Sequence, residues 1–118
     1  MSIENSINRK SLSERLDGDF ELFKELAQLF LTDLPKLLLA IEEAIKARNG
    51  EKIGKSAHTI KGAISNFSAD KAYQAALALE KIGKNNELDK AEDFFRELLK
   101  EIEAMKEALT LLMAENKL

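Results

Sequence analysis

The sequence predicts an all-α protein, an antiparallel up-down-up-down four-helix bundle preceded by a short N-terminal helix. Ala, Leu, Glu and Lys dominate the 118 residues, and the single proline and five glycines also favour long helices over a sheet. In four long segments the apolar residues recur at helical steps of three and four. Segments of this kind, joined by short connectors, bury their apolar faces most economically in a bundle.

The bulk composition bounds the function as well as the fold. A length of 118 residues suits one compact domain, and a net charge of −3 argues against a nucleic-acid binder. The absence of cysteine excludes disulfides, thiol chemistry and cysteine-ligated metals. No signal-peptide pattern opens the chain, and its most apolar stretch, "LPKLLLAIEEAI", is too short and too charged to cross a membrane. We therefore expect a soluble, cytoplasmic protein.

The start of the chain predicts a loose segment followed by a short helix. Residues 1–10 are polar and aperiodic, so we expect them to be flexible, with the bundle domain spanning residues 11–118. The segment "SLSERL" predicts a short helix with Ser11 as its N-cap. The sequence "DGD" then breaks this helix, and Asp19 can cap the next one.

The longest apolar stripe predicts a helix from Phe20 to about Asn49-Gly50. Its members are spaced by three or four residues: Phe23, Ala27, Phe30, Leu34, Leu37, Ile41 and Ile45. Pro35 lies inside this run and removes the backbone hydrogen bond that would reach back to Leu31. Because the stripe continues in phase past the proline, we expect one kinked helix rather than two separate ones.

Three further stripes complete the predicted bundle. The third helix carries Ile53, Ala57, Ile60, Ile64 and Phe67. The fourth helix, with Ser68 as its N-cap and Gly83 as its stop, carries Ala72, Ala76, Leu79 and Ile82. The connector "GKNNELD" leads to a last helix that starts near Asp89 and runs almost to the C-terminus. Its stripe is Ala91, Phe95, Leu98, Ile102, Met105, Leu109 and Leu112.

The only histidine, His58, lies in the third helix but away from its apolar stripe. At about 100° per residue, His58 falls roughly 140° and Gly62 roughly 180° from the centre of that stripe. Lys61 and Gly62 follow His58 by three and four positions, so the three residues adjoin on the helix surface. An exposed mid-helix glycine costs about 1 kcal/mol relative to alanine. Here it leaves open space beside the imidazole, which predicts that something bulky approaches His58 closely.

The residues by themselves leave other readings open. A surface histidine is usually a solvated bystander, and exposed lysines are ordinary. A non-catalytic adaptor bundle that binds a partner protein explains the apolar stripes, but it does not explain an exposed Gly62 beside His58. A metal-binding bundle draws Glu and His inward from several helices, and the stripes here carry neither. The chain also lacks a nucleotide-binding glycine loop and an acidic Mg²⁺ cluster, which excludes an ATP-dependent kinase.

The segment "AHTIKGAISNFSA" resembles the signature of histidine-containing phosphotransfer (HPt) domains, in which H-x-x-K-G lies in the middle of a helix. The resemblance extends over about 105 of the 118 residues, including the acidic-glycine break and the proline in the long helix. One departure is Ser68, which stands where the family often has glycine. We interpret that serine as a helix cap.

The resemblance implies that His58 accepts a phosphoryl group, at Nε2, from the aspartyl phosphate of a receiver domain and passes it to the aspartate of another receiver. It also implies that Lys61 stabilises the phosphoryl charge and that Gly62 clears space for the receiver. Glu80 matches a position where family members carry glutamine or glutamate, which implies an orienting role for it. The alternative for Glu80 is a solvated charge on a helix face.

The resemblance also implies the partners of such a protein. Receiver domains of response regulators are expected to dock on it, as is a hybrid sensor histidine kinase, and the receiver supplies the Mg²⁺, so the chain needs no cofactor of its own. We expect Leu12 and Leu16 of the first helix to contact the receiver, unless they simply cover the end of the bundle. The protein is then a monomeric phosphoryl carrier rather than an enzyme, with neither nucleic acid nor membrane as a partner. Its cognate receivers, the direction of phosphate flow and whether it is a free shuttle or a domain of a hybrid kinase stay open.

Overall fold

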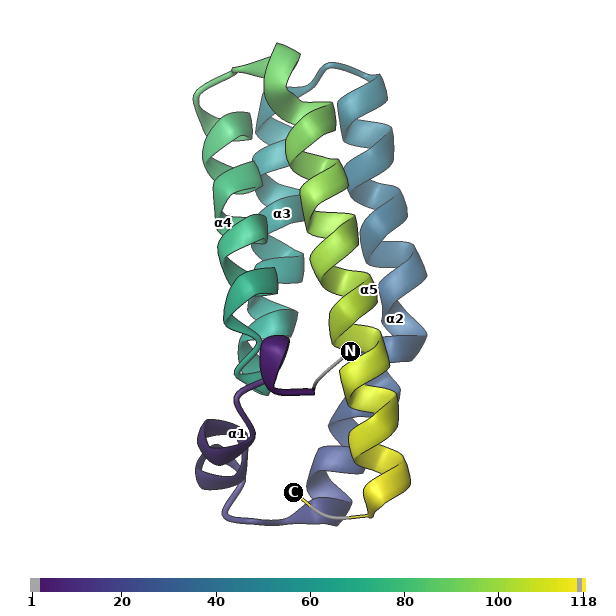
Figure 1. Cartoon of the computed structure of the whole chain (residues 1–118). Helices are drawn as coiled ribbons and strands as arrows, with labels where there is room; N and C mark the ends of the chain where they lie inside the picture. The colour runs from purple at the N-terminus through teal and green to yellow at the C-terminus, as the bar shows by residue number, and fades with distance from the viewer. Residues whose placement is uncertain (1–2, 117) are drawn as a thin grey trace.

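The computed structural model describes residues 3–116 and 118, and within them it is all-α (Figure 1). The α-helices are α1 (Arg9–Arg15), α2 (Phe20–Lys46), α3 (Gly50–Ile64), α4 (Asp70–Lys84) and α5 (Ala91–Glu115). Three short 3-10 turns accompany them, η1 (Ile3–Asn5), η2 (Ser65–Phe67) and η3 (Leu88–Lys90), and this part of the chain contains no strand. The prediction of an all-α protein is confirmed, with a short first helix in addition to four long ones.

The four long helices lie side by side and give the molecule a rod-like shape of 42 × 22 × 21 Å. The connections from α2 to α3 and from α4 to α5 lie at the upper end in Figure 1, and the connection from α3 to α4 lies lower down. Below that connection α2 and α5 continue beyond the other two helices, and α1 lies beside them. No helix of residues 3–116 is long and apolar enough to span a membrane.

The predicted apolar stripes form the core. Every member of the α3 and α4 stripes is buried, as are most members of the other two, and only Leu37, Ile45 and Phe95 are partly exposed. The ring of Phe67 packs against Phe23 and Phe30, at centroid distances of 6.4 and 5.3 Å. Burying one such side chain contributes about 1.5–3 kcal/mol, so these three rings are a substantial part of the core that stabilises the bundle.

Side-chain hydrogen bonds mark where α1 and α2 begin, and Pro35 does not interrupt α2. Asp19 caps α2 as predicted, because its carboxylate accepts a hydrogen bond from the backbone N–H of Leu22 at 3.0 Å. The predicted N-cap of α1 is wrong by three positions: the side chain of Asn8 accepts from the N–H of Ser11, which lies inside the helix. Pro35 lies within one continuous α2, so the prediction of a single helix is confirmed. The kink itself stays a prediction.

The segment before α1 differs from the expectation of a flexible tail over residues 1–10. Ile7 is only 1% exposed and belongs to the core. The N–H of Asn8 donates to the carbonyl of Ser68 at 3.0 Å, and Arg9 forms an ion pair with Glu115 at 2.9 Å. Single apolar residues between polar ones show no periodicity, so the sequence pattern gave no sign that Ile7 is buried and that this segment is bonded to the bundle. The expectation for residues 1–2 lies outside the described residues.

The turn between α3 and α4 corrects the role of Ser68. Its φ of +53° is left-handed, and the N-cap of α4 is Ala69, which makes no side-chain capping bond. The hydroxyl of Ser68 instead lies 2.9 Å from that of Ser11, so the serine joins this turn to α1. Glycine adopts a positive φ without a steric cost, which explains why it suits this position.

The end of α4 corrects the role of Gly83. The helix continues to Lys84, and Gly83 lies buried where α4 crosses Gly50 and Gly54 of α3. A Cβ at Gly83 would lie 2.5 Å from the nitrogen of Gly54 and 2.7 Å from the carbonyl oxygen of Gly50. Gly83 is therefore needed for the close approach of two backbones, and Asn86, with a φ of +57°, reverses the chain beyond the helix.

Candidate functional site

His58 projects from the middle of α3, as the helical spacing predicts. Its side chain is 66% exposed, and Gly62 is exposed one turn further along the helix. A Cβ at Gly62 would have no atom within 4 Å, other than those of its own helix and chain neighbours, so the space beside the imidazole is open. This glycine fills no helix crossing, in contrast to Gly83.

Glu80 of α4 is the direct partner of the imidazole. Its Oε2 lies 3.0 Å from Nδ1 of His58, although the carboxylate itself is only 4% exposed. The alternative of a solvated helix-face charge is therefore wrong. Because an ionised carboxylate can only accept hydrogen bonds, Nδ1 must be the donor in this contact. In a neutral imidazole that arrangement leaves the lone pair on Nε2.

Two lysines neutralise the buried carboxylate. The ammonium of Lys61 lies 2.7 Å from Oε1 of Glu80, and that of Lys84 lies 2.9 Å from Oε2. Lys61 is only 15% exposed and also lies over the ring of Tyr73, at 5.9 Å from its centroid, whereas Lys84 is 65% exposed. Sequence reasoning placed Lys61 at the surface and missed Lys84. The signal that could have found Lys84 is its spacing of four positions from Glu80 on one helix.

The electrostatics keep Glu80 ionised. Burial raises the pKa of its carboxyl, but the ion pairs with Lys61 and Lys84 and the hydrogen bond from His58 outweigh burial and lower the pKa to about 2. The close contact with Glu80 in turn raises the pKa of Lys61, against the opposing effect of burial. Near neutral pH the site therefore contains a carboxylate held between two ammonium groups and the imidazole.

Comparison with known proteins gives this arrangement a family. The Hpt domain family matches residues 25–108, well over half of the chain. The protein belongs to the Hpt domain family. Hpt domains are histidine phosphotransfer modules of two-component phosphorelays, which carry phosphoryl groups rather than catalyse a reaction, and they work with receiver domains and kinases.

A solved structure agrees with this assignment at the level of the fold. The crystal structure of histidine-containing phosphotransfer protein B (HptB) from Pseudomonas aeruginosa PAO1 superposes on this Hpt domain with a TM-score of 0.83. The match covers 90% of this chain and 92% of HptB at 19% sequence identity. No curated protein matches the sequence.

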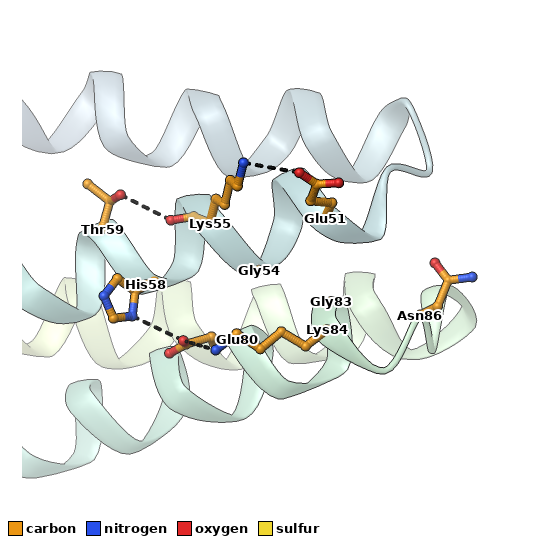
Figure 2. Close-up of a pocket in the computed structure, with 9 residues that line it drawn as sticks. All are labelled: Glu51, Gly54, Lys55, His58, Thr59, Glu80, Gly83, Lys84 and Asn86. Carbon is orange, nitrogen blue, oxygen red and sulfur yellow. Dashed lines mark hydrogen bonds and ion pairs between the residues drawn. The ribbon is translucent and has the colours of Figure 1, made fainter.

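A groove of about 740 Å³ opens beside the histidine of this Hpt domain. Figure 2 shows that His58 points across it from α3 toward Glu80, with Lys84 reaching the same carboxylate along α4. Gly54 and Gly83 also line it, as does Lys55, which forms an ion pair with Glu51. Within the described residues no cluster of His, Cys, Asp and Glu could hold a metal ion.

The two leucines predicted for docking lie in different environments. Leu12 has no exposed surface and belongs to the core of the Hpt domain, so a contact between its side chain and a partner is not supported. The spacing of a seven-residue helix did not reveal which side of α1 faces the bundle. Leu16, at the end of α1, is partly exposed and stays a predicted docking residue.

Proposed function

We propose that this Hpt domain accepts a phosphoryl group on Nε2 of His58 from the aspartyl phosphate of one receiver domain and delivers it to the aspartate of another. The observation that carries this proposal is the contact of 3.0 Å between Nδ1 of His58 and Oε2 of Glu80. That contact orients an exposed imidazole and supports a nucleophilic lone pair on Nε2, directed away from Glu80.

The transfer conserves atoms and charge without a cofactor in this chain. The lone pair on Nε2 attacks phosphorus, the bond from phosphorus to the aspartyl oxygen breaks, and its electron pair stays on the aspartate. The proton stays on Nδ1, so the phosphorylated ring gains a positive charge beside the carboxylate of Glu80. Delivery to the next receiver reverses these steps. Positioning and charge neutralisation supply most of the catalysis in such transfers, and the receiver brings the Mg²⁺.

The neighbouring residues have supporting roles in this proposal. Lys61 adds positive charge to the site through its ion pair with Glu80, and Gly62 leaves room for the receiver beside the imidazole. Leu16 contributes apolar surface to the docking face. A non-catalytic adaptor, the alternative, would need neither an imidazole held by a buried carboxylate nor an open space beside it.

The proposal extends to the assembly and setting of the protein. We infer a monomer whose four long helices alternate up and down in an antiparallel bundle, and a domain that includes Ile7 and all of α1 in addition to the residues 11–118 predicted from the sequence. We also infer a cytoplasmic location, where receivers of response regulators and a hybrid sensor histidine kinase are its partners.

The test is a transfer assay with the native protein and the His58→Gln variant. Each is incubated with a panel of receiver domains carrying radiolabelled phosphate, and the label is followed. The native protein should gain acid-labile, base-stable label, and the variant should gain none, because no second imidazole exists in the chain. The variant should stay folded, because the glutamine amide can donate to Oε2 of Glu80 and that oxygen keeps its ion pair with Lys84. Label retained on a folded His58→Gln protein would refute the assignment.

A further inference from the structure

The two lysines at Glu80 occupy different sides of its carboxylate. Lys61 takes Oε1, is mostly covered and lies over the ring of Tyr73. Lys84 takes Oε2, is largely exposed and lines the groove beside His58, which Lys61 does not. Figure 2 shows the Lys84 side chain running along α4 toward Glu80 and the imidazole. An anion that reaches His58 through this groove therefore meets Lys84.

The distances place Lys84 close to the reacting ring. Its ammonium lies 2.9 Å and Nδ1 of His58 lies 3.0 Å from the same oxygen of Glu80, so these two nitrogens are no more than about 6 Å apart. A Cβ at Gly54 would lie 3.3 Å from Cγ of Lys84. Gly54 precedes His58 by one helical turn, so this glycine gives the lysine stem a path along α3 toward the histidine.

The free-energy cost of leaving the carboxylate of Glu80 differs between Lys61 and Lys84. If Lys61 left Oε1, a carboxylate that is only 4% exposed would lose its best-covered counter-charge, which is expensive in a buried site. Lys84 is 65% exposed on a flexible four-carbon stem, and its departure still leaves Glu80 bonded to Lys61 and to His58. Lys84 is thus the cation that can exchange a carboxylate oxygen for a phosphoryl oxygen.

We propose that Lys84 contacts the phosphoryl group during transfer to and from His58, while Lys61 remains on Glu80 and holds it in place. This inference rests on the proposed function. No bond to Lys84 forms or breaks: the lysine moves from one anion to another, and its three N–H donors match the phosphoryl oxygens.

The test uses phosphoramidate, a small phosphoryl donor, so that no receiver needs to be known. Attack by Nε2 of His58 on its phosphorus breaks the P–N bond and releases ammonia. Removing one charge-assisted hydrogen bond should slow phosphorylation about tenfold in Lys84→Ala, and Lys84→Arg should recover most of the rate. Lys55→Ala is the matched control, because Lys55 lines the same groove but is paired with Glu51. It should stay within about twofold of the native rate, since it removes only a screened surface charge.

A second measurement separates contact with phosphate from positioning of the ring. The imidazole nitrogen signals of unphosphorylated His58 in NMR should report the same tautomer, with the proton on Nδ1, in Lys84→Ala and in the native protein, because Glu80 keeps its contact with Nδ1. If the tautomer changes, Lys84 acts through Glu80 and the inference is wrong. Equal rates for Lys84→Ala and Lys55→Ala would also overturn it. A native protein that gains no phosphate on His58 from either phosphoramidate or receivers would instead count against the proposed function.

Discussion

His58 on α3 and Glu80 on α4 are 22 positions apart in the chain, yet Nδ1 of one lies 3.0 Å from Oε2 of the other. The pair joins an exposed ring to a buried carboxylate, so the ring is available to a partner while its orientation is set from inside the bundle. Three cationic or hydrogen-bonding groups converge on that one carboxylate.

Glu80 should couple stability to acidic pH. Its pKa falls from an ordinary 4.5 to about 2 in the folded protein. A lowered carboxyl pKa stabilises the fold above the unfolded value, and the contribution is lost as the pH falls from about 4.5 to 2. The difference in unfolding free energy between the native protein and Glu80→Gln should shrink over that range by on the order of 1–3 kcal/mol. Urea denaturation at several pH values measures it, and a constant difference would contradict the prediction.

Lys61→Ala should slow transfer without stopping it. The nucleophile remains, but Glu80 loses its best-covered counter-charge and holds the imidazole less firmly. A decrease of about tenfold is therefore expected in the transfer rate from a phosphorylated receiver. Lys55→Ala provides the control for a general loss of surface charge. A folded Lys61→Ala protein that transfers at the native rate, or not at all, would be inconsistent with this role.

Gly62→Gln should discriminate between bulky and small phosphoryl donors. The space beside His58 is open, and a glutamine side chain would occupy it on the docking side. Transfer from a receiver domain should slow, whereas phosphorylation by phosphoramidate should stay close to the native rate. The variant should be as stable as the native protein or about 1 kcal/mol more stable, because glycine is the poorer helix former. Equal receiver transfer in both proteins would disprove steric clearance.

Two glycine-to-alanine changes should have opposite effects on stability. Gly62→Ala adds a methyl group to open space and should stabilise the protein by up to about 1 kcal/mol. Gly83→Ala places its Cβ 2.5 Å from the nitrogen of Gly54, so the helices must separate, at a cost of about 1–3 kcal/mol. Thermal denaturation of both variants tests the contrast. Similar changes of the same sign would show that the crossing is not tight.

Ser68 should lose stability through its strained backbone and regain some through the hydrogen bond of its hydroxyl. Its φ is +53°, and its hydroxyl lies 2.9 Å from that of Ser11. Ser68→Ala and Ser68→Gly both remove this hydrogen bond, but only glycine relieves the left-handed backbone. We expect the free energy of unfolding to be about 1 kcal/mol higher for the glycine variant than for the alanine variant. Equal stabilities in chemical denaturation would mean that the turn is not strained.

Periodicity predicted the parts of the fold in which each helix acts alone. The stripe from Ile53 to Phe67 and the exposure of His58 both follow from 3.6 residues per turn, and the structure has them as predicted. Features that depend on contacts between helices, or on the backbone conformation of a turn, were not predicted. Gly83 looks like a helix stop until Gly54 is known to face it, and Ser68 looks like a cap until its φ is known.

In the candidate site, too, the sequence predicted what lies on one helix but not the contacts between helices. The spacing of His58, Lys61 and Gly62 indicated three neighbours on one face, but it could not show that Lys61 turns toward a carboxylate on another helix. Burial of Glu80 was hidden because a charged residue beside an apolar stripe ordinarily stays in water. Leu12 shows the converse, since a seven-residue helix is too short for its apolar positions to reveal which side is buried.

The backbone contact between α3 and α4 also fixes the distance between the two helices at the site. Gly54 lies one turn before His58, and Gly83 lies one turn after Glu80, so the two helices touch main chain to main chain just beside the imidazole and its carboxylate. Main-chain atoms are identical whatever the side chains are. Side chains elsewhere in the core can therefore be substituted while the distance between Glu80 and His58 stays the same. The contact that separates the two helices at this point is made by backbone atoms, which such substitutions do not alter.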